Sequence, residues 1–179
     1  MKRKVFFISL IGISLVAILG LFITGCDKNV NTNPTTGFVE LYLLDSYKTV
    51  GYSRQIDEST IVTKAYPLIA YSDILSYDSS NYTFKITDKA KRAINNLTHS
   101  VFGVAFAIKA NYVIVYSGYF WPSFSSATCD WAIIDPIMID YHKGLKVELG
   151  YPGPWASVPD RRNDQRILDI FANDHKLSR

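Results

Sequence analysis

The sequence predicts an α+β domain, with a mainly antiparallel sheet of about five to seven strands and two helices packed on it. Strand-like segments are grouped around two widely separated amphipathic segments, without the regular strand–helix alternation of a parallel sheet. The chain shows no internal period of about 20–50 residues, which excludes solenoids and propellers. Its 179 residues are 48% hydrophobic and 14% aromatic, enough for one packed core and too apolar for a disordered chain.

The first part of the expected domain consists of short strands separated by polar stretches. Residues 38–44 are rich in aromatic and branched side chains and predict a strand, whereas the polar residues 45–60 predict a loop. A further short strand is expected at residues 61–65. Residues 81–86 alternate polar and apolar side chains, as a strand with one wet face does. Residues 69–77 carry no clear signal for either kind of structure.

The first helix is predicted directly after this alternating strand. Thr87 and Asp88 supply an N-cap and an acidic first turn. The charged side chains that follow are interpreted as a solvated helix face and not as a binding patch. The buried face is marked by apolar residues at the i, i+3, i+4 and i+7 spacing, namely Ala90, Ala93, Ile94 and Leu97.

Two pairs of strands are expected in the centre of the domain. Residues 101–108 are apolar enough to be covered on both faces, and residues 112–120 return after a turn at 109–111 that contains an asparagine. These segments form the clearest hairpin of the sequence. A second pair is expected from residues 131–139 and 145–149.

The last part of the domain is predicted to be a rigid loop followed by a helix. Residues 150–155 are too rich in proline and glycine for regular structure. A helix is expected over residues 163–174. Its apolar stripe consists of Ile167, Leu168, Ile170 and Phe171.

Residues 1–25 have the layout of an export signal. Basic residues at positions 2–4 precede an unbroken apolar run over residues 5–24, and the chain turns polar after Cys26. The residues Ile23-Thr24-Gly25-Cys26 resemble the lipobox of bacterial lipoproteins, in which the cysteine sulfur receives a diacylglycerol and the signal peptidase cuts just before it. The resemblance implies that Cys26 becomes a lipidated N-terminus. An uncleaved transmembrane helix is the alternative, because the apolar run is long enough to span about 30 Å of hydrocarbon.

These features divide the chain into three parts. They are a lipoprotein signal peptide (1–25), a lipidated cysteine with a flexible polar tether (26–36) and a single α+β domain (37–179). The expected location is the bacterial cell envelope, with the protein lipid-anchored to a membrane through Cys26 and facing outside the cytoplasm.

Processing changes both the charge and the cysteine count. The full chain has 19 Lys plus Arg against 16 Asp plus Glu, and the leader contains three of the basic residues and none of the acidic ones. The remaining chain is therefore formally neutral, which gives no support for a nucleic-acid partner. A lipidated Cys26 leaves Cys129 alone, without an intramolecular disulfide, and a lone cysteine of this kind is interpreted as buried.

Residues 119–131 join two expected strands and are rich in aromatic and hydroxyl side chains. A simpler interpretation than binding is a turn whose hydroxyls satisfy the local backbone while Trp121 and Trp131 fill the core, and we favour it. As a binding loop, the same segment offers stacking surface from Trp121 and Phe124. Hydrogen bonds to a ligand or partner would then come from Ser125, Ser126 and Thr128.

Arg161 and Arg162 precede the last expected helix, with Asp160 and Asp164 beside them. Paired arginines near a helix N-terminus are candidate contacts for an anionic ligand, a lipid headgroup or a partner. The alternating signs of charge favour a structural role instead, in which arginine–carboxylate pairs fasten the last helix to the sheet.

The expected function is that of a binding or interaction module for a protein or another envelope component. One alternative is a membrane-tethered hydrolase that uses Cys129 or a serine of the 123–128 loop together with a histidine. A second alternative is a small-molecule or glycan binder that uses exposed aromatic side chains, with Trp155 added to those of the 119–131 segment. No cofactor or metal is predicted, because the histidines are scattered outside any recognisable motif, at His99, His142 and His175.

Overall fold

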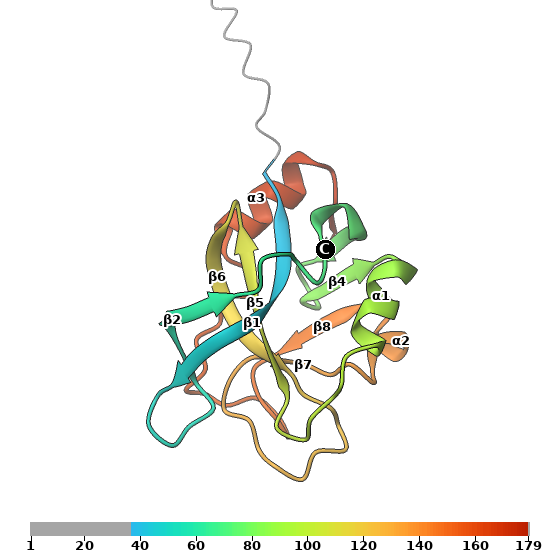
Figure 1. The fold of residues 1–179 in the computed structure, drawn as a ribbon. Coiled ribbons are helices and arrows are strands. Elements are labelled where there is room, and N and C mark those ends of the chain that lie inside the picture. The colour runs from blue at the N-terminus through green and yellow to red at the C-terminus, as the bar shows by residue number, and fades with distance from the viewer. Residues whose placement is uncertain (1–36, 179) are drawn as a thin grey trace, which may run out of the picture. The chain divides into compact units, whose positions relative to one another are not determined.

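Residues 37–178, the part of the chain that this computed structural model describes, fold into one mixed sheet with helices (Figure 1). The α-helices are α1 (Asp88–Asn95), α2 (Ile139–His142) and α3 (Gln165–Asn173). None of the helices in this range is long and apolar enough to cross a membrane. The strands are β1 (Val39–Thr49), β2 (Ile56–Thr63), β3 (Ile74–Asp78), β4 (Thr83–Ile86), β5 (Val104–Ala110), β6 (Val113–Phe120), β7 (Ile133–Ile134), β8 (Leu145–Glu148) and β9 (Leu177–Ser178).

The sheet has nine strands in the order β2-β1-β5-β6-β7-β8-β4-β3-β9. Six of its eight neighbouring pairs are antiparallel, and the pairs β6–β7 and β3–β9 are parallel. The predicted α+β class is confirmed, whereas nine strands and three helices exceed the five to seven strands and two helices expected. The predicted signal peptide, the lipidation of Cys26 and the tether at 26–36 lie outside the described residues.

The predicted central hairpin is confirmed as β5–β6. Its two-residue turn is formed by Asn111 and Tyr112, both with positive φ (50° and 68°), the geometry that suits the twist of a tight hairpin. The turn therefore lies one residue further along the chain than expected. Asn111 also fixes the start of the domain, because its Oδ1 accepts a hydrogen bond of 3.0 Å from the backbone N–H of Phe38.

The loop predicted for residues 45–60 is wrong. Strand β1 continues to Thr49, and β2 pairs back with it, so that only residues 50–55 form the connection. The side chains of β1 are exposed from Asp45 onward, whereas β2 begins with the buried Ile56. Polar side chains add hydrogen bonds between these two strands. For example, Thr60 Oγ1 in β2 accepts a hydrogen bond of 2.9 Å from Lys48 N in β1.

The second expected strand pair is present only as a short pair. Strand β7 contains two residues instead of the nine of the expected strand, and its pairing with β8 aligns Ile133 with Glu148. Pro136 cannot donate a ladder hydrogen bond, and the chain turns instead into the short helix α2. The unassigned residues 69–77 form a 3₁₀ turn (Tyr71–Asp73) and most of β3.

Both predicted helices are present and capped by their own sequence. Thr87 Oγ1 accepts a hydrogen bond from Ala90 N at the start of α1, and Asp164 caps α3 through Arg166 N. Both helices bury their apolar faces in the main core, which lies between them and the sheet. Helix α3 begins two residues later than predicted, because Asp164 is its N-cap.

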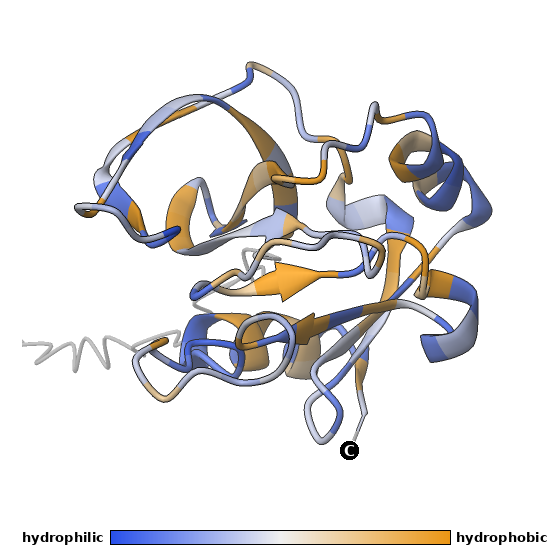
Figure 2. Ribbon diagram, turned by 90° about the horizontal axis from the view of Figure 1, so that it is seen from below, coloured by the Kyte–Doolittle hydropathy of each residue, from blue (hydrophilic) through white to orange (hydrophobic). Residues whose placement is uncertain are grey.

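A second, smaller core supports the connections at one end of the sheet. Its largest members are Tyr119 and Trp121, whose rings meet edge to face with centroids 6.0 Å apart. The other buried members are Ile56, Ala105, Cys129 and Ile133. Figure 2 views the domain from this end and shows a central strand in orange, surrounded by connections of mixed hydropathy.

Candidate functional site

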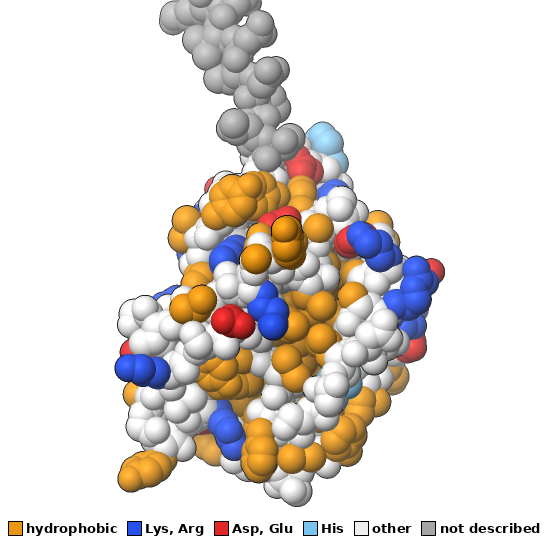
Figure 3. Space-filling view, in the orientation of Figure 1, with side chains coloured by type: hydrophobic (Ala, Val, Ile, Leu, Met, Phe, Trp, Pro, Cys, Tyr) orange, Lys and Arg blue, Asp and Glu red, His pale blue; other side chains and the backbone are white. Residues whose placement is uncertain are grey.

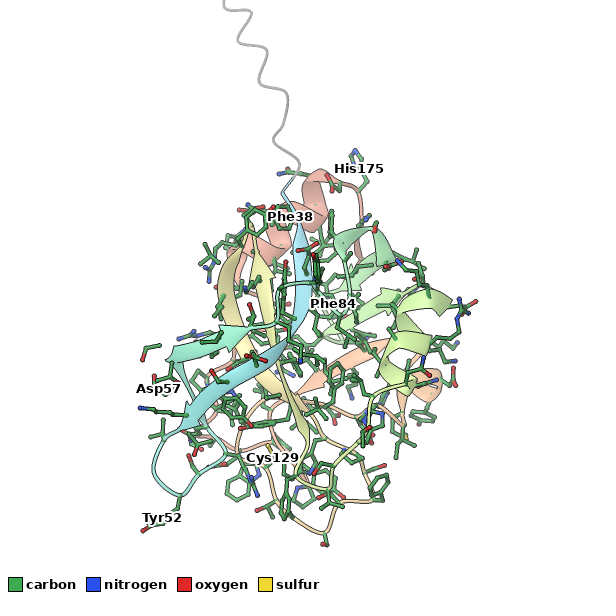
Figure 4. All side chains as sticks on the ribbon, in the orientation of Figure 1. Phe38, Tyr52, Asp57, Phe84, Cys129 and His175 are labelled. Carbon is green, nitrogen blue, oxygen red and sulfur yellow. The ribbon has the colours of Figure 1, made fainter. Side chains whose placement is uncertain are left out.

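Four connecting segments gather at one end of the domain, here called the loop end. They are residues 50–55, 99–103, 121–130 and 150–157, and Figure 1 shows them below the sheet. The chain enters the domain at the opposite end, where Figure 4 places Phe38 and His175, while Tyr52 lies at the loop end. Strand β1 connects the two ends with 11 residues, which corresponds to roughly 35 Å of extended chain.

Long-range hydrogen bonds tie the loop-end segments to one another. The carboxylate Oδ1 of Asp130 accepts a hydrogen bond of 2.7 Å from the backbone N–H of Arg54, which is 76 residues away in sequence. The hydroxyl of Ser125 donates a bond of 2.6 Å to the carbonyl oxygen of Val101. These contacts join the 121–130 segment to the 50–55 and 99–103 segments.

The 150–157 segment is joined to the 121–130 segment through Tyr151. Its backbone exchanges two hydrogen bonds of 2.9 Å with that of Cys129, and its hydroxyl donates a bond of 2.8 Å to the carbonyl oxygen of Ser123. The loop end is therefore a cross-linked platform on a packed core, the arrangement in which loops present side chains in fixed positions.

The aromatic side chains predicted for binding fall into two groups. Trp121 is fully buried in the smaller core, as the favoured structural interpretation expected, and its ring offers no surface to a ligand. Phe124 is 61% exposed and Trp155 is 40% exposed. The sequence interpretation missed two further exposed rings at the loop end, Tyr52 and Phe102. In Figure 3 hydrophobic side chains are visible along this end of the domain.

The hydroxyl side chains of the 121–130 segment also divide. Ser125 is buried and serves the fold, because its Oγ donates to Val101 and accepts a bond of 3.1 Å from Ala127 N. Ser126 and Thr128 are exposed, and neither side chain forms a hydrogen bond with another residue of the 37–178 range. These two hydroxyls are therefore free to meet a ligand.

An open cleft of about 530 Å³, here called the distal cleft, lies between the hairpin tip of β1–β2 and the 121–130 segment. Its volume falls within the range of about 300–1,000 Å³ that is usual for small-molecule sites. It combines two aromatic rings, two Ser or Thr hydroxyls that the fold does not use and one charge of each sign, while the third such hydroxyl, that of Ser53, donates to Val50 O. The side chains concerned are those of Tyr52, Arg54, Ser126, Thr128, Asp130 and Trp155.

Arg162 lies at a second cleft of about 610 Å³, on the other side of the 150–154 loop. Its guanidinium forms a two-point ion pair with Asp160, at 2.9 Å and 2.7 Å, and lies 3.5 Å from the centroid of the Tyr82 ring. Hydrogen bonding by Arg162 lowers the pKa of Asp160 below its usual range. Arg162 is therefore fully engaged within the fold.

Arg161 is engaged in the same way. Its Nη1 lies 2.8 Å from Glu58 Oε2 in β2 and 3.3 Å from the carbonyl oxygen of Val115 in β6. The two predicted anion contacts thus hold the segment before α3 against the sheet, as the structural interpretation of the alternating charges expected.

Two of the candidate nucleophiles, Cys129 and Ser125, face backbone carbonyl groups. Burial raises the pKa of the Cys129 thiol to about 12, and its Sγ lies 3.8 Å from the carbonyl oxygen of Trp131. Within residues 37–178, neither Cys129 nor Ser125 has a histidine or carboxylate side chain as a hydrogen-bond partner. The same range contains no cluster of three or more metal-binding side chains.

Comparison of the chain with known protein families, with characterised proteins and with solved structures found no match. The case for a function therefore rests on the geometry of the loop end and on the leader sequence.

Proposed function

We propose that this protein is a membrane-anchored cell-envelope lipoprotein, held by lipid on Cys26 and facing outside the cytoplasm. Residues 26–36 are the tether, and residues 37–179 form a binding module. The module uses its loop end to contact a protein or another component of the envelope.

The observation that carries this proposal is the position of the loop end relative to the start of the domain. The chain enters β1 beside the Asn111 turn, and the exposed ring of Tyr52 lies at the opposite end (Figure 4). The exposed rings of Phe124 and Trp155 belong to the 121–130 and 150–157 segments of the same loop end. A domain attached through the residues before position 37 would therefore carry these rings at the end opposite its point of attachment. Exposed aromatic side chains on a rigid frame are typical of recognition surfaces.

The cross-links of the loop end favour binding for an energetic reason. Loops that become ordered only on binding lose conformational entropy, which weakens the complex. Here the hydrogen bonds from Arg54 to Asp130 and from Ser125 to Val101 fix the segments before a ligand arrives. The hydrolase alternative lacks comparable support, since the buried Cys129 thiol meets a carbonyl oxygen instead of a general base.

The anchor is tested by mass spectrometry of the membrane fraction, with Cys26→Ala as the matched variant. We expect a wild-type peptide that begins at Cys26 and carries a diacylglyceryl group, and we expect the variant to lack it. A wild-type chain that retains Met1 and the whole leader would contradict the lipoprotein assignment and favour a transmembrane anchor.

The binding role is tested by site-specific photo-cross-linking in living cells. A photoreactive amino acid replaces Phe124 in one variant and Tyr66 in another. Tyr66 serves as the matched control, because its side chain is also exposed (84%) and it lies outside the loop end. We expect a discrete cross-linked species from position 124 only. Equal labelling at both positions, or none at position 124, would contradict the use of the loop end for binding.

A further inference from the structure

We propose that the distal cleft binds a neutral glycan, a chain of uncharged sugar rings, and this inference rests on the binding role proposed above. The cleft is lined by the rings of Tyr52 and Trp155, by Arg54 and Asp130 and by the two free hydroxyls. The argument has three steps: the aromatic rings, the balance of charge and the supply of hydrogen bonds.

The aromatic rings suit the flat faces of sugar rings. A pyranose presents C–H groups on its faces and hydroxyls around its edge, so an aromatic ring packs on the face while polar groups reach the edge. The ring of Trp155 is held in place, because its backbone N–H donates to Leu149 O at 2.7 Å and its Nε1 donates to Tyr151 O at 3.4 Å. Tyr52 projects fully into solvent from the hairpin tip and is free to close over a bound ring.

The charges of the cleft balance each other. Arg54 and Asp130 supply one positive and one negative group to the lining of the cleft. No carboxylate within residues 37–178 forms an ion pair with Arg54, whose guanidinium lies over the Phe102 ring at 5.0 Å. A strongly anionic or cationic ligand would meet repulsion from one of the two charges, whereas a polyhydroxylated neutral ligand uses both as hydrogen-bond donor and acceptor.

The polar groups of the cleft are fixed and unoccupied. Asp130 keeps one oxygen on Arg54 N, which orients its carboxylate and leaves the second oxygen for a hydroxyl donor. Ser126 and Thr128 add two hydroxyls that the fold does not use. A planar protein surface would leave such polar groups partly unpaired, so the concave, polar cleft favours a small glycan segment over a protein partner.

The test is isothermal titration calorimetry of the full-length chain in detergent micelles. The probes are four neutral tetrasaccharides (chitotetraose, cellotetraose, maltotetraose and mannotetraose). We expect at least one of these to bind. Trp155→Ala should raise its Kd ~10-fold. Asp130→Asn, which keeps the acceptor for Arg54 N, should raise it severalfold. Tyr66→Ala, outside the cleft, should leave it within about twofold.

The outcomes distinguish a failure of the glycan proposal from a failure of the binding role proposed for the loop end. No binding to any of the four tetrasaccharides would overturn the glycan proposal, and cross-linking at position 124 to a protein would then assign the loop end to a protein partner. Glycan binding that survives both cleft variants would also overturn it. Unfolding of each variant is followed by circular dichroism, so that Asp130→Asn keeps the test decisive where Trp155→Ala fails to fold.

Discussion

Arg161 Nη1 lies 2.8 Å from Glu58 Oε2, and this ion pair covers the open edge of β6. Strand β6 has no neighbour on that side until its pairing with β7 begins at Tyr119. Glu58 Oε1 accepts a hydrogen bond of 3.0 Å from Ser117 N, and Arg161 donates to Val115 O at 3.3 Å. Two charged side chains thus replace the hydrogen bonds that another strand would supply.

The first prediction concerns the removal of the Glu58 carboxylate, which accepts the hydrogen bond from Ser117 N. Glu58→Ala should lower the free energy of unfolding by about 2 kcal/mol, because the buried Ser117 N–H loses its partner. Glu58→Gln keeps a carbonyl acceptor and should cost less than half as much. Asp45→Ala removes a long, solvent-exposed ion pair with Lys64 and should change stability by under about 0.5 kcal/mol. Urea unfolding measures all three, and equal losses for Glu58→Ala and Asp45→Ala would contradict the account.

The parts of the fold that the sequence predicted are those with local signals. The β5–β6 hairpin follows from apolar strands around an asparagine turn, and α1 follows from its Thr87 cap and apolar spacing. The β1–β2 extension was not predicted, because its exposed strands carry polar side chains. The parallel addition of β9 to β3 depends on a contact about 100 residues distant, aligning Tyr77 with Leu177, and no local pattern specifies it.

The candidate site was predicted only in part for the same reason. Phe124, Ser126 and Thr128 are exposed at the loop end, but Tyr52 and Arg54 lie in the stretch that was interpreted as an irregular loop. One missed signal was available. Strand β6 is buried on both faces from Val115 onward, and Trp121 lies two residues after Tyr119, on the side that packs in the smaller core, whereas Phe124 lies beyond the strand.

The second prediction contrasts two glycines. A Cβ on Gly118 in β6 would lie 2.6 Å from Ala132 O and 2.7 Å from Phe106 Cζ, so Gly118→Ala should cost about 2–3 kcal/mol or prevent folding. Gly51 has a φ of +57° and open space around it, so Gly51→Ala should cost only about 1 kcal/mol through backbone strain. Thermal unfolding compares the two variants. A Gly51 variant as unstable as the Gly118 variant would contradict the steric explanation.

The third prediction concerns acid stability. Hydrogen bonds, first that from the Asn81 side chain and then that from Ser80, lower the pKa of Asp78 to about 2. The unfolded value is about 3.9, so Asp78 contributes stability above about pH 4 that is lost as the pH falls toward 2. Asp78→Asn should flatten the decrease of unfolding free energy in that window. NMR titration of the carboxyl carbon should give a midpoint near 2 in the wild type and a higher one in Asn81→Ala. A wild-type midpoint near 4 would refute this.

The fourth prediction concerns Cys129, whose pKa burial raises to about 12. The neutral thiol is favoured by the fold, so its contribution to stability is present below the unfolded pKa of about 8.5 and is lost as the pH rises toward 12. The test uses the Cys26→Ala chain, in which Cys129 is the sole cysteine. With a disulfide reagent at pH 8, the reaction of Cys129 should be at least ~100-fold slower in the folded chain than in urea. The reason is that the thiolate is the attacking species and burial disfavours it.

A matched variant makes this measurement decisive for the hydrolase alternative. Thr128→Cys, added to the Cys26→Ala chain, places a thiol on the exposed loop and should react rapidly in the folded state, with one equivalent consumed before Cys129 responds. A nucleophilic cysteine requires a thiolate near neutral pH. Rapid reaction of Cys129 in the folded chain, with a midpoint below pH 8, would therefore support the hydrolase and contradict the buried, neutral thiol. Slow reaction leaves Cys129 as part of the core beneath the loop end.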